Sequence, residues 1–141
     1  MSKWKRKRDA NHSQIQRLWQ GLGWQVIDTA LVGPNAVPGF PDLMCVRDGL
    51  VVLCEVKTQE GVLSRDEEAF LYSYDGLWCV VREAKEVLTI SEWLRRQLYL
   101  LHTPHGGEDD EQLTMESLMD RCRGFLSRYR GVEETASTTP R

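Results

Sequence analysis

Three charged residues lie at the ends of segments whose composition otherwise suits burial. Asp42 closes the turn-like stretch GFPD at positions 39–42, and Glu55 and Lys57 close the apolar run LVVLCEVK at positions 50–57. Side chains two positions apart on a strand point to the same face, so we expect Glu55 and Lys57 to be neighbours in space. Because burying an unpaired charge is costly, charged residues in segments suited to burial are expected to serve a functional site.

A predicted β-hairpin brings the third charge to the same place. The segment reads as a strand over 42–47, an Asp-Gly turn at 48–49 and a second strand over 50–57. Asp-Gly is a dipeptide that two-residue hairpin turns favour. In this hairpin position 42 lies opposite positions 55 to 56. The three charges are therefore expected to converge at one end of one face of a sheet.

Two carboxylates and an ammonium group at one point suit a divalent cation. Carboxylates held close repel each other, so one takes up a proton unless a cation lies between them. Mg²⁺ typically binds one or two carboxylates with water and phosphate oxygens, and Lys57 beside it can orient a water or stabilise charge on a phosphate. This arrangement predicts metal-assisted phosphodiester hydrolysis. The alternative is an ordinary Pro-Asp turn beside a half-exposed ion pair of small worth; the hairpin favours the first interpretation, because it brings Asp42 to the same point.

Before the hairpin, the sequence predicts a helix, a strand and a loop. Apolar residues at helical spacing predict the helix over 11–22, and a strand over 24–28 follows. The segment 32–41 contains three prolines and two glycines, which predicts a loop.

After the hairpin, a helix is predicted over 64–74, with Ser64 as N-cap and Glu67 completing a capping box. A buried strand over 77–81 follows, and then a helix over 83–101, which either continues through Thr89 or breaks near it. The order α-β-β-β-α-β-α predicts an α/β fold with a mixed central sheet flanked by helices.

The length of 141 residues suits one domain, and its charge is unevenly distributed. Residues 1–103 carry 13 Lys or Arg and 13 Asp or Glu, whereas residues 104–141 carry 5 and 8, so the net charge of −3 comes from the second part. We therefore expect the domain to span 1–103. Residues 104–141 are expected to form an acidic linker, a C-terminal helix over 113–130 that docks on the core or on a partner, and a disordered end.

A basic cluster near the N-terminus is a candidate for binding phosphates of a nucleic acid. It consists of Lys3, Lys5, Arg6, Lys7 and Arg8. These side chains can hold phosphates, with Trp4 available for stacking; the alternative is a frayed, solvated terminus. No apolar run has the length of a membrane-spanning helix, and the N-terminus lacks the apolar region of a signal peptide. We therefore expect a cytoplasmic protein with no membrane partner.

The motifs together resemble the PD-(D/E)xK nuclease superfamily, which includes restriction endonucleases, archaeal-type Holliday-junction resolvases and the VRR-NUC group. GFPD, followed by EVK at the end of an apolar strand, is similar to the motif that names the superfamily. KRDANHSQIQRLWQGLGWQVIDTALVG resembles the opening of small phage-type nucleases, and EVKTQEGVLSRDEEAF and VVREAKEVL resemble their later segments. The resemblance covers about residues 6–90. It implies a restriction-endonuclease-like core, in the host cytoplasm if the protein is phage-encoded.

By this resemblance Asp42, Glu55 and the backbone carbonyl of Val56 would bind Mg²⁺ or Mn²⁺. Lys57 would position the attacking water. The resemblance thus implies three catalytic residues, Asp42, Glu55 and Lys57, and agrees with the chemistry expected from the residues themselves.

The sequence departs from the relatives' pattern on two helices. Where relatives commonly have a glutamate on the first helix, NHSQIQ offers His12, Gln14 and Gln16, with Asp9 just before it. Where relatives often have glutamine on the helix after EVK, this chain has a glutamate. Either change is expected to weaken metal binding or alter the preferred metal. The accessory candidates are Asp9, Gln14, Gln59 and Glu67, whereas His12 is expected to be exposed, with a catalytic role the less favoured interpretation.

The expected function is that of a Mg²⁺-dependent DNA endonuclease. It is expected to be structure-specific, on junctions, flaps or nicks, because no separate target-recognition domain is visible. The alternative is a catalytically weakened or inactive nucleic-acid-binding protein on the same fold. A homodimer is expected because resolving a junction takes two matched cuts and the junction-resolving relatives are dimers. Segments 89–101 and 113–126 hold more apolar residues than one small core obviously needs, so they are the expected interface.

Overall fold

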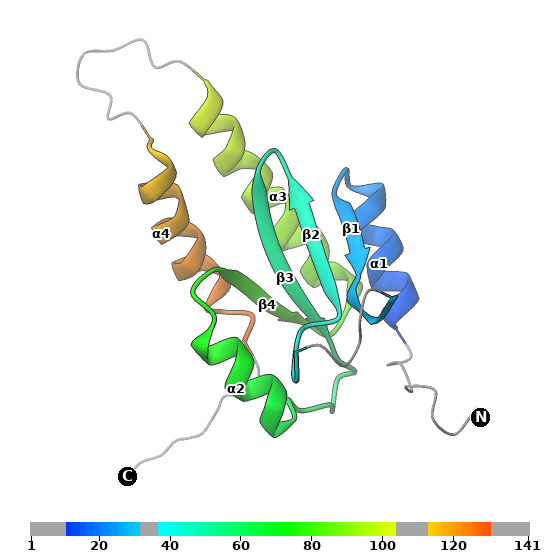
Figure 1. Ribbon diagram of the computed structural model, residues 1–141. Coiled ribbons are helices and arrows are strands. Elements are labelled where there is room, and N and C mark those ends of the chain that lie inside the picture. The colour runs from blue at the N-terminus through cyan, green and yellow to red at the C-terminus, as the bar shows by residue number, and fades with distance from the viewer. Residues whose placement is uncertain (1–10, 32–36, 104–112, 131–141) are drawn as a thin grey trace.

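The computed structural model describes residues 11–31, 37–103 and 113–130, and within these ranges it shows a four-stranded sheet with helices on both faces (Figure 1). The strand order is β1-β2-β3-β4; the first three strands are antiparallel, whereas β4 is parallel to β3. The elements in chain order are α1 (His12–Gly21), β1 (Gln25–Asp28), the 3₁₀ turn η2 (Thr29–Leu31), β2 (Leu43–Arg47), β3 (Leu50–Val56), α2 (Arg65–Ser73), β4 (Leu77–Val81), α3 (Ala84–His102) and α4 (Met115–Leu126). The predicted α/β fold with a mixed sheet is confirmed.

The β2–β3 hairpin has the predicted turn and register. Both turn residues, at positions 48–49, have positive φ angles, 50° and 85°, as a two-residue type I′ turn requires. The ladder pairs Leu43 with Cys54, so one further step places Asp42 opposite Glu55. β2 begins one residue later and β3 ends one residue earlier than predicted.

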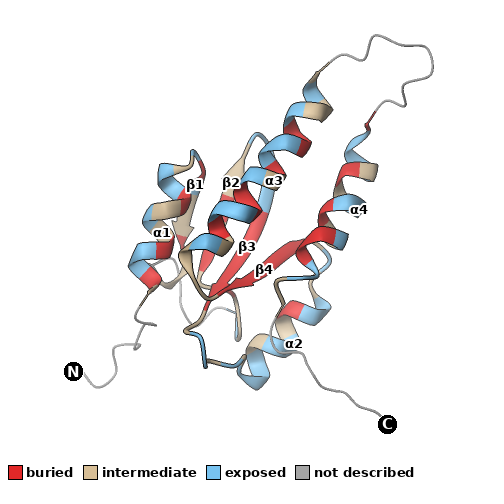
Figure 2. Ribbon diagram, turned by 180° about the vertical axis from the view of Figure 1, so that it is seen from behind, coloured by how far each residue is buried: buried red, intermediate tan, exposed pale blue. Residues whose placement is uncertain are grey.

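Helices α1, α3 and α4 cover one face of the sheet, and α2 covers the other (Figures 1 and 2). The main core lies under the three helices and includes Trp19 of α1, Leu94 of α3 and Leu118 of α4. All four cysteines of the chain are buried as free thiols. Their contribution to this fold is therefore that of small hydrophobic side chains.

A smaller cluster on the other face packs Leu53 of β3, and Trp78 and Val80 of β4, against Leu71 of α2. Alternate residues of a strand point to opposite faces, so Glu55 shares the face of Leu53. The end of β3 that carries Glu55 therefore opens towards α2.

The predicted capping box begins α2. Ser64 Oγ accepts from the N–H of Glu67 at 3.1 Å, and the Glu67 carboxylate accepts from the N–H of Ser64 at 2.8 Å. These two hydrogen bonds satisfy backbone donors that the first turn of a helix otherwise leaves unpaired. Glu67 is thereby fixed at the helix end nearest to β3's C-terminus.

Helix α3 is continuous over its 19 residues, so the alternative of a break near Thr89 is wrong. β-Branched residues lower helix propensity only slightly, and here Val87, Ile90 and Leu94 are fully buried in the main core. The free energy gained by burying these side chains outweighs the slightly lower helix propensity of the β-branched residues near Thr89. Neither α3 nor any other described helix combines the length and apolar composition needed to cross a membrane.

Helix α4 corresponds to the predicted C-terminal helix, and it is shorter than the expected 113–130. Its buried residues, which include Leu118, Cys122 and Leu126, join the main core. The apolar residues that motivated a dimer interface over 113–126 are therefore largely used within one chain. Of the two alternatives, docking on the core is confirmed.

Candidate active site

Asp42 is held at the start of β2 by backbone donors from two other segments. Its Oδ2 accepts a hydrogen bond from the N–H of Val56 at 2.9 Å. Its own carbonyl accepts from both the N–H and the hydroxyl of Thr29, each at 3.0 Å. These bonds lock the carboxylate of Asp42 beside the end of β3, where Glu55 lies.

Lys57 lies between two carboxylates. Its Nζ is 3.3 Å from Glu55 Oε2 and 2.9 Å from Glu67 Oε1. The side chain of Lys57 is only 14 % exposed, so neither ion pair is a freely solvated contact. The structure therefore brings Asp42, Glu55 and Lys57 together as predicted and adds Glu67, one of the four accessory candidates.

Glu55 has the most strongly raised pKa of the carboxyl groups in the site. The residue is 2 % exposed, and no N–H group donates to its Oε1. Burial raises the pKa of Glu55 most, and the charges of Asp42 and Glu67 raise it further, to about 10. Burial also raises the pKa of Asp42, against the opposing hydrogen bond from Val56. In the absence of a cation, Glu55 therefore holds a proton at neutral pH.

The pKa values of Lys57 and Glu67, unlike that of Glu55, are shifted in the directions that favour the charged forms. Burial by itself lowers the pKa of Lys57, but its hydrogen bond to Glu67 and the charge of Glu55 outweigh this effect and raise the pKa. Burial by itself raises the pKa of Glu67, but hydrogen bonds from Lys57 and from Ser64 N–H outweigh it and lower the pKa. Both side chains of this pair are therefore charged at neutral pH.

Two residues that sequence reasoning missed hold the backbone around Lys57. Asn11 Nδ2 donates to the carbonyls of Lys57, at 3.2 Å, and of Arg82, at 3.0 Å. Arg82 Nη1 in turn donates to the carbonyls of Thr58, at 2.8 Å, and of Gly61. Asn11 is the N-cap residue of α1, but its side chain forms no capping hydrogen bond. An Asn at a helix start usually caps its own helix, so no local pattern indicated that this side chain would bind distant carbonyl groups.

His12 is buried, so the expectation that it would be exposed is wrong. It is 3 % exposed, because it lies three residues before Ile15 and seven before Trp19, on the helix stripe that faces the core. Its Nε2 lies 3.4 Å from Asp28 Oδ2. The electrostatic effect of His12 also lowers the pKa of Asp42, against the larger opposing effect of burial.

Asp28, which sequence reasoning did not single out, ends β1 beside this histidine. It is 7 % exposed, and its Oδ1 accepts from the N–H of Ala30 at 3.1 Å. Asp28 therefore orders the chain where β1 turns towards the loop that leads to Asp42. Its signal was an acidic residue closing a predicted strand, the same signal that identified Glu55.

Two further accessory candidates are exposed. Gln14 is exposed on α1, and Gln59 is exposed in the turn after β3. The remaining ones lie outside the described residues: the accessory candidate Asp9 and the basic cluster Lys3, Lys5, Arg6, Lys7 and Arg8. For these the predictions stand as made.

The residues present fit a magnesium or manganese ion. Across the described ranges no group of three or more His, Cys, Asp or Glu side chains is arranged to hold a metal. Mg²⁺ needs only one or two carboxylates, because water and substrate oxygens fill its other positions. Asp42 and Glu55 supply these, and the backbone carbonyl of Val56 is the predicted third oxygen. The buried Oε1 of Glu55, to which no N–H group donates, is the observation that a cation would explain.

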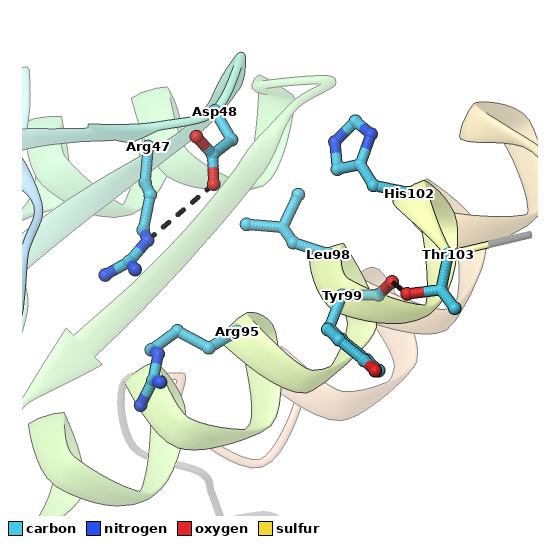
Figure 3. A pocket seen from close by; sticks show the side chains of 7 residues that line it. All are labelled: Arg47, Asp48, Arg95, Leu98, Tyr99, His102 and Thr103. Atoms are coloured by element: carbon cyan, nitrogen blue, oxygen red, sulfur yellow. Dashed lines mark hydrogen bonds and ion pairs between the residues drawn. The ribbon is translucent and has the colours of Figure 1, made fainter.

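A pocket of about 390 Å³ lies elsewhere, at the far end of the hairpin (Figure 3). It is lined by Arg47 and Asp48 at the hairpin turn and by α3 residues that include Arg95 and Leu98. The length of β2 separates this pocket from Asp42. The pocket is therefore not the place where the three predicted catalytic residues meet.

The chain matches no protein-family model, no curated protein and no solved structure. What the site can do therefore rests on its own geometry. It combines the carboxyl groups of Asp42 and Glu55 with the ammonium group of Lys57, which lies 3.3 Å from Glu55. Glu55 is buried and is protonated when no cation is present.

Proposed function

We propose that this protein is a Mg²⁺-dependent endonuclease that hydrolyses phosphodiester bonds in branched, flap or junction DNA in the cytoplasm. The proposal includes a restriction-endonuclease-like core and membership of the PD-(D/E)xK superfamily, on the motif resemblance described above. The support from the structure is the convergence of Asp42, Glu55 and Lys57 at the end of one hairpin.

One observation carries the proposal: Glu55 is buried beside Asp42 and Glu67, and burial together with the charges of these two carboxylates raises its pKa to about 10. A carboxyl group 2 % exposed is costly unless it is protonated or bound to a cation. An enzyme with no use for this charge would be more stable with an uncharged residue there. A metal site explains why Glu55, Asp42 and a lysine lie together at this point of the sheet.

Each residue has a role that its position supports. Asp42 and Glu55 would hold the metal, and the Val56 N–H keeps Asp42 aligned for this role. When bound, the metal supplies Lewis-acid stabilisation of charge on the phosphate and lowers the pKa of a bound water. Lys57 would orient the attacking water and stabilise negative charge that develops on the phosphate. Asn11 and Arg82 keep the backbone of this lysine in place.

The substrate class follows from two features of the chain. The basic cluster of residues 3–8 can hold phosphates without reading sequence. The described elements all pack around a single sheet, with no additional unit among them that would read bases. A nuclease of this kind selects DNA by shape.

The test is a cleavage assay with purified full-length protein. Supercoiled plasmid, a four-way junction, a flap and a matched linear duplex are incubated with Mg²⁺, with Mn²⁺ or with EDTA. We expect cleavage of the branched substrates only when metal is present. Equal cleavage of the linear duplex would overturn structure specificity, and metal-independent cleavage would overturn the mechanism.

A second candidate function, an inactive DNA-binding protein on the same fold, is favoured by one observation. Lys57 is paired at 2.9 Å with Glu67, where relatives often have glutamine. This pairing withdraws the lysine from substrate. Binding to branched DNA in EDTA without any cleavage in Mg²⁺ or Mn²⁺ would favour this function over the first.

A further inference from the structure

The pocket at the far end of the hairpin has an excess of positive charge. It lies between the β2–β3 turn and the C-terminal half of α3 (Figure 3), and its volume of about 390 Å³ is in the usual range for sites that bind small molecules. Its lining contains Arg47, Arg95 and Asp48, so these residues carry a net charge of +1 when His102 is neutral. The whole chain has a net charge of −3. The lining of this pocket therefore suits an anionic group, in contrast to the chain as a whole.

Arg47 is held in the pocket by the backbone of another element. Its Nη1 donates to the carbonyl of Leu22, the C-cap residue of α1, at 2.6 Å. Its guanidinium group lies against Gly23, which has no side chain to displace it. The hydrogen bond to Leu22 uses one of five N–H groups, and the side chain of Arg47 is 27 % exposed, so other N–H groups can reach a ligand. A cation held in place beforehand loses less conformational freedom when it binds.

Arg95 supplies a second guanidinium group, from α3. Its side chain is exposed, and it forms no hydrogen bond or ion pair with any residue that the structure describes. Figure 3 shows the side chains of Arg47 and Arg95 ending on the same side of the pocket. Two guanidinium groups that come from different elements can bond different oxygens of one phosphate group. Their convergence therefore favours a phosphate as the anion.

The one carboxylate in the lining does not occupy Arg47. Asp48 Oδ2 lies 3.8 Å from Arg47 Nε, which is too long for a hydrogen bond. The side chain of Asp48 is 60 % exposed, so water and salt screen its charge. This ion pair is therefore weak, and it leaves Arg47 available to a stronger anionic partner.

The remaining lining of the pocket suits a planar ring. Tyr99 is 67 % exposed although it is a large aromatic residue, and Leu98 adds apolar surface beside it. An exposed aromatic ring can stack on any nucleic-acid base, because every base has a π-face. The pocket thus presents an aromatic ring and two guanidinium groups together. A ring joined to a phosphate is the ligand that would use both.

We propose that this pocket binds one nucleotide unit, with its phosphate at Arg47 and Arg95 and its base against Tyr99. A unit of a DNA strand and a free mononucleotide present the same phosphate and ring. β2 separates the pocket from Asp42 by about 17 Å, at about 3.4 Å for each of its five residues. The nucleotide is therefore bound away from the candidate active site. The proposal does not depend on cleavage, and only DNA as the source of the nucleotide rests on the proposed function.

An NMR titration of the isotope-labelled full-length protein tests the proposal in metal-free buffer. The ligands are deoxyadenosine monophosphate and its two parts, inorganic phosphate and deoxyadenosine. The mononucleotide should bind saturably and shift amide signals of the α3 segment 95–103, whereas each part should bind at least about tenfold more weakly because it makes only some of the contacts. No saturable binding up to about 10 mM mononucleotide, or shifts confined to the basic cluster of residues 3–8, would overturn the proposal. Neither result would affect the proposed cleavage chemistry, since no metal is present.

Two neighbouring arginines of α3 provide a matched pair of variants. Arg95→Gln removes a guanidinium group from the pocket and should weaken binding of the mononucleotide at least about tenfold. Arg96→Gln makes the same change at the next residue, which is exposed and does not line the pocket, so binding should stay within about twofold of wild type. Circular dichroism checks that both variants are folded. Equal losses in the two variants would indicate a general attraction between charges and would overturn the proposal.

Tyr99→Leu tests the base contact separately. It should weaken binding of the mononucleotide by about fivefold or more, because a stacked base is lost, and leave binding of inorganic phosphate unchanged. An unchanged affinity for the mononucleotide would overturn the placement of the base at Tyr99.

A short single strand of deoxyadenosine nucleotides distinguishes the two sources. If DNA is the source, the strand binds more tightly than the mononucleotide and is weakened by Arg95→Gln but not by Arg96→Gln. If a free mononucleotide is the source, Arg95→Gln weakens only the mononucleotide and leaves binding of the strand unchanged. Each of these results supports a nucleotide site in the pocket and identifies the form in which the nucleotide arrives.

Discussion

The N–H of Val56 donates a hydrogen bond to Asp42 Oδ2 over 2.9 Å. The strand that carries Glu55 thus holds the other carboxylate of the site with its own backbone. The spacing of the two carboxyl groups depends on the register of one hairpin, which the turn at 48–49 and the buried residues of both strands determine. The site is therefore as rigid as the hairpin itself, as a metal-binding pair of carboxylates requires.

Asp42→Asn and Glu55→Gln should each abolish Mg²⁺-dependent cleavage of branched DNA. Each removes a charged oxygen ligand, and a loss of at least about a hundredfold is expected for a group that stabilises charge at the reaction centre. Binding of DNA in EDTA should be largely kept. Glu68→Gln, the same acid-to-amide change at an exposed position of α2, is the matched control. Activity near wild type in both acidic-site variants would contradict the proposed role.

Glu55→Gln should stabilise the metal-free protein, and the gain should grow with pH. The pKa of Glu55 is about 10 in the folded protein against an ordinary 4.5, so the folded state holds a proton that the unfolded state has released. Its contribution to stability is complete below the lower value and is lost as pH rises towards the higher one.

Glutamine does not ionise, so the Glu55→Gln variant does not lose this stability as pH rises. The expected gain is on the order of 1–3 kcal/mol at about pH 7. Urea unfolding in EDTA at several pH values measures it, with Glu68→Gln as an exposed control. A gain that does not change with pH would show that Glu55 is not protonated in the folded state.

Glu67→Gln should raise the rate of cleavage at saturating Mg²⁺ by a few-fold. Glutamine can still accept from the N–H of Ser64, so the capping box of α2 is kept. The change removes the nearer of the two anionic partners of Lys57, which leaves the ammonium group more available to substrate. Single-turnover kinetics measures the effect, and Glu68→Gln again serves as control. A slower variant would mean that Glu67 supports the reaction.

Asn11→Asp should destabilise the protein more than Asn11→Ala, although aspartate has the shape of asparagine. The amide of Asn11 donates to two carbonyl oxygens, those of Lys57 and Arg82. Alanine leaves them without this donor, at a cost of about 1–3 kcal/mol. Aspartate adds an acceptor that repels them. Chemical unfolding of both variants gives the order, and an Asn11→Ala variant as stable as wild type would rule out a stabilising donor role for Asn11.

Local signals along the chain were sufficient to predict the β2–β3 hairpin and the convergence of Asp42, Glu55 and Lys57 at its end. An Asp-Gly turn between two apolar strands sets the register, and a register determines which residues lie opposite each other. The capping box at Ser64 was equally local, because its partners are three residues apart. Such features depend on near neighbours along the chain, so residue types and spacing are enough to predict them.

The surroundings of the site were decided only by the tertiary structure. His12 is buried because it lies on the face of α1 that also carries Ile15 and Trp19 and packs on the core. Asn11 lies beside Lys57 and Arg82, which are 46 and 71 residues away. α3 stays continuous through Thr89 because distant elements bury its apolar stripe. Burial and long-range contacts depend on which face of each element meets the sheet, and residue type and spacing alone do not specify that choice.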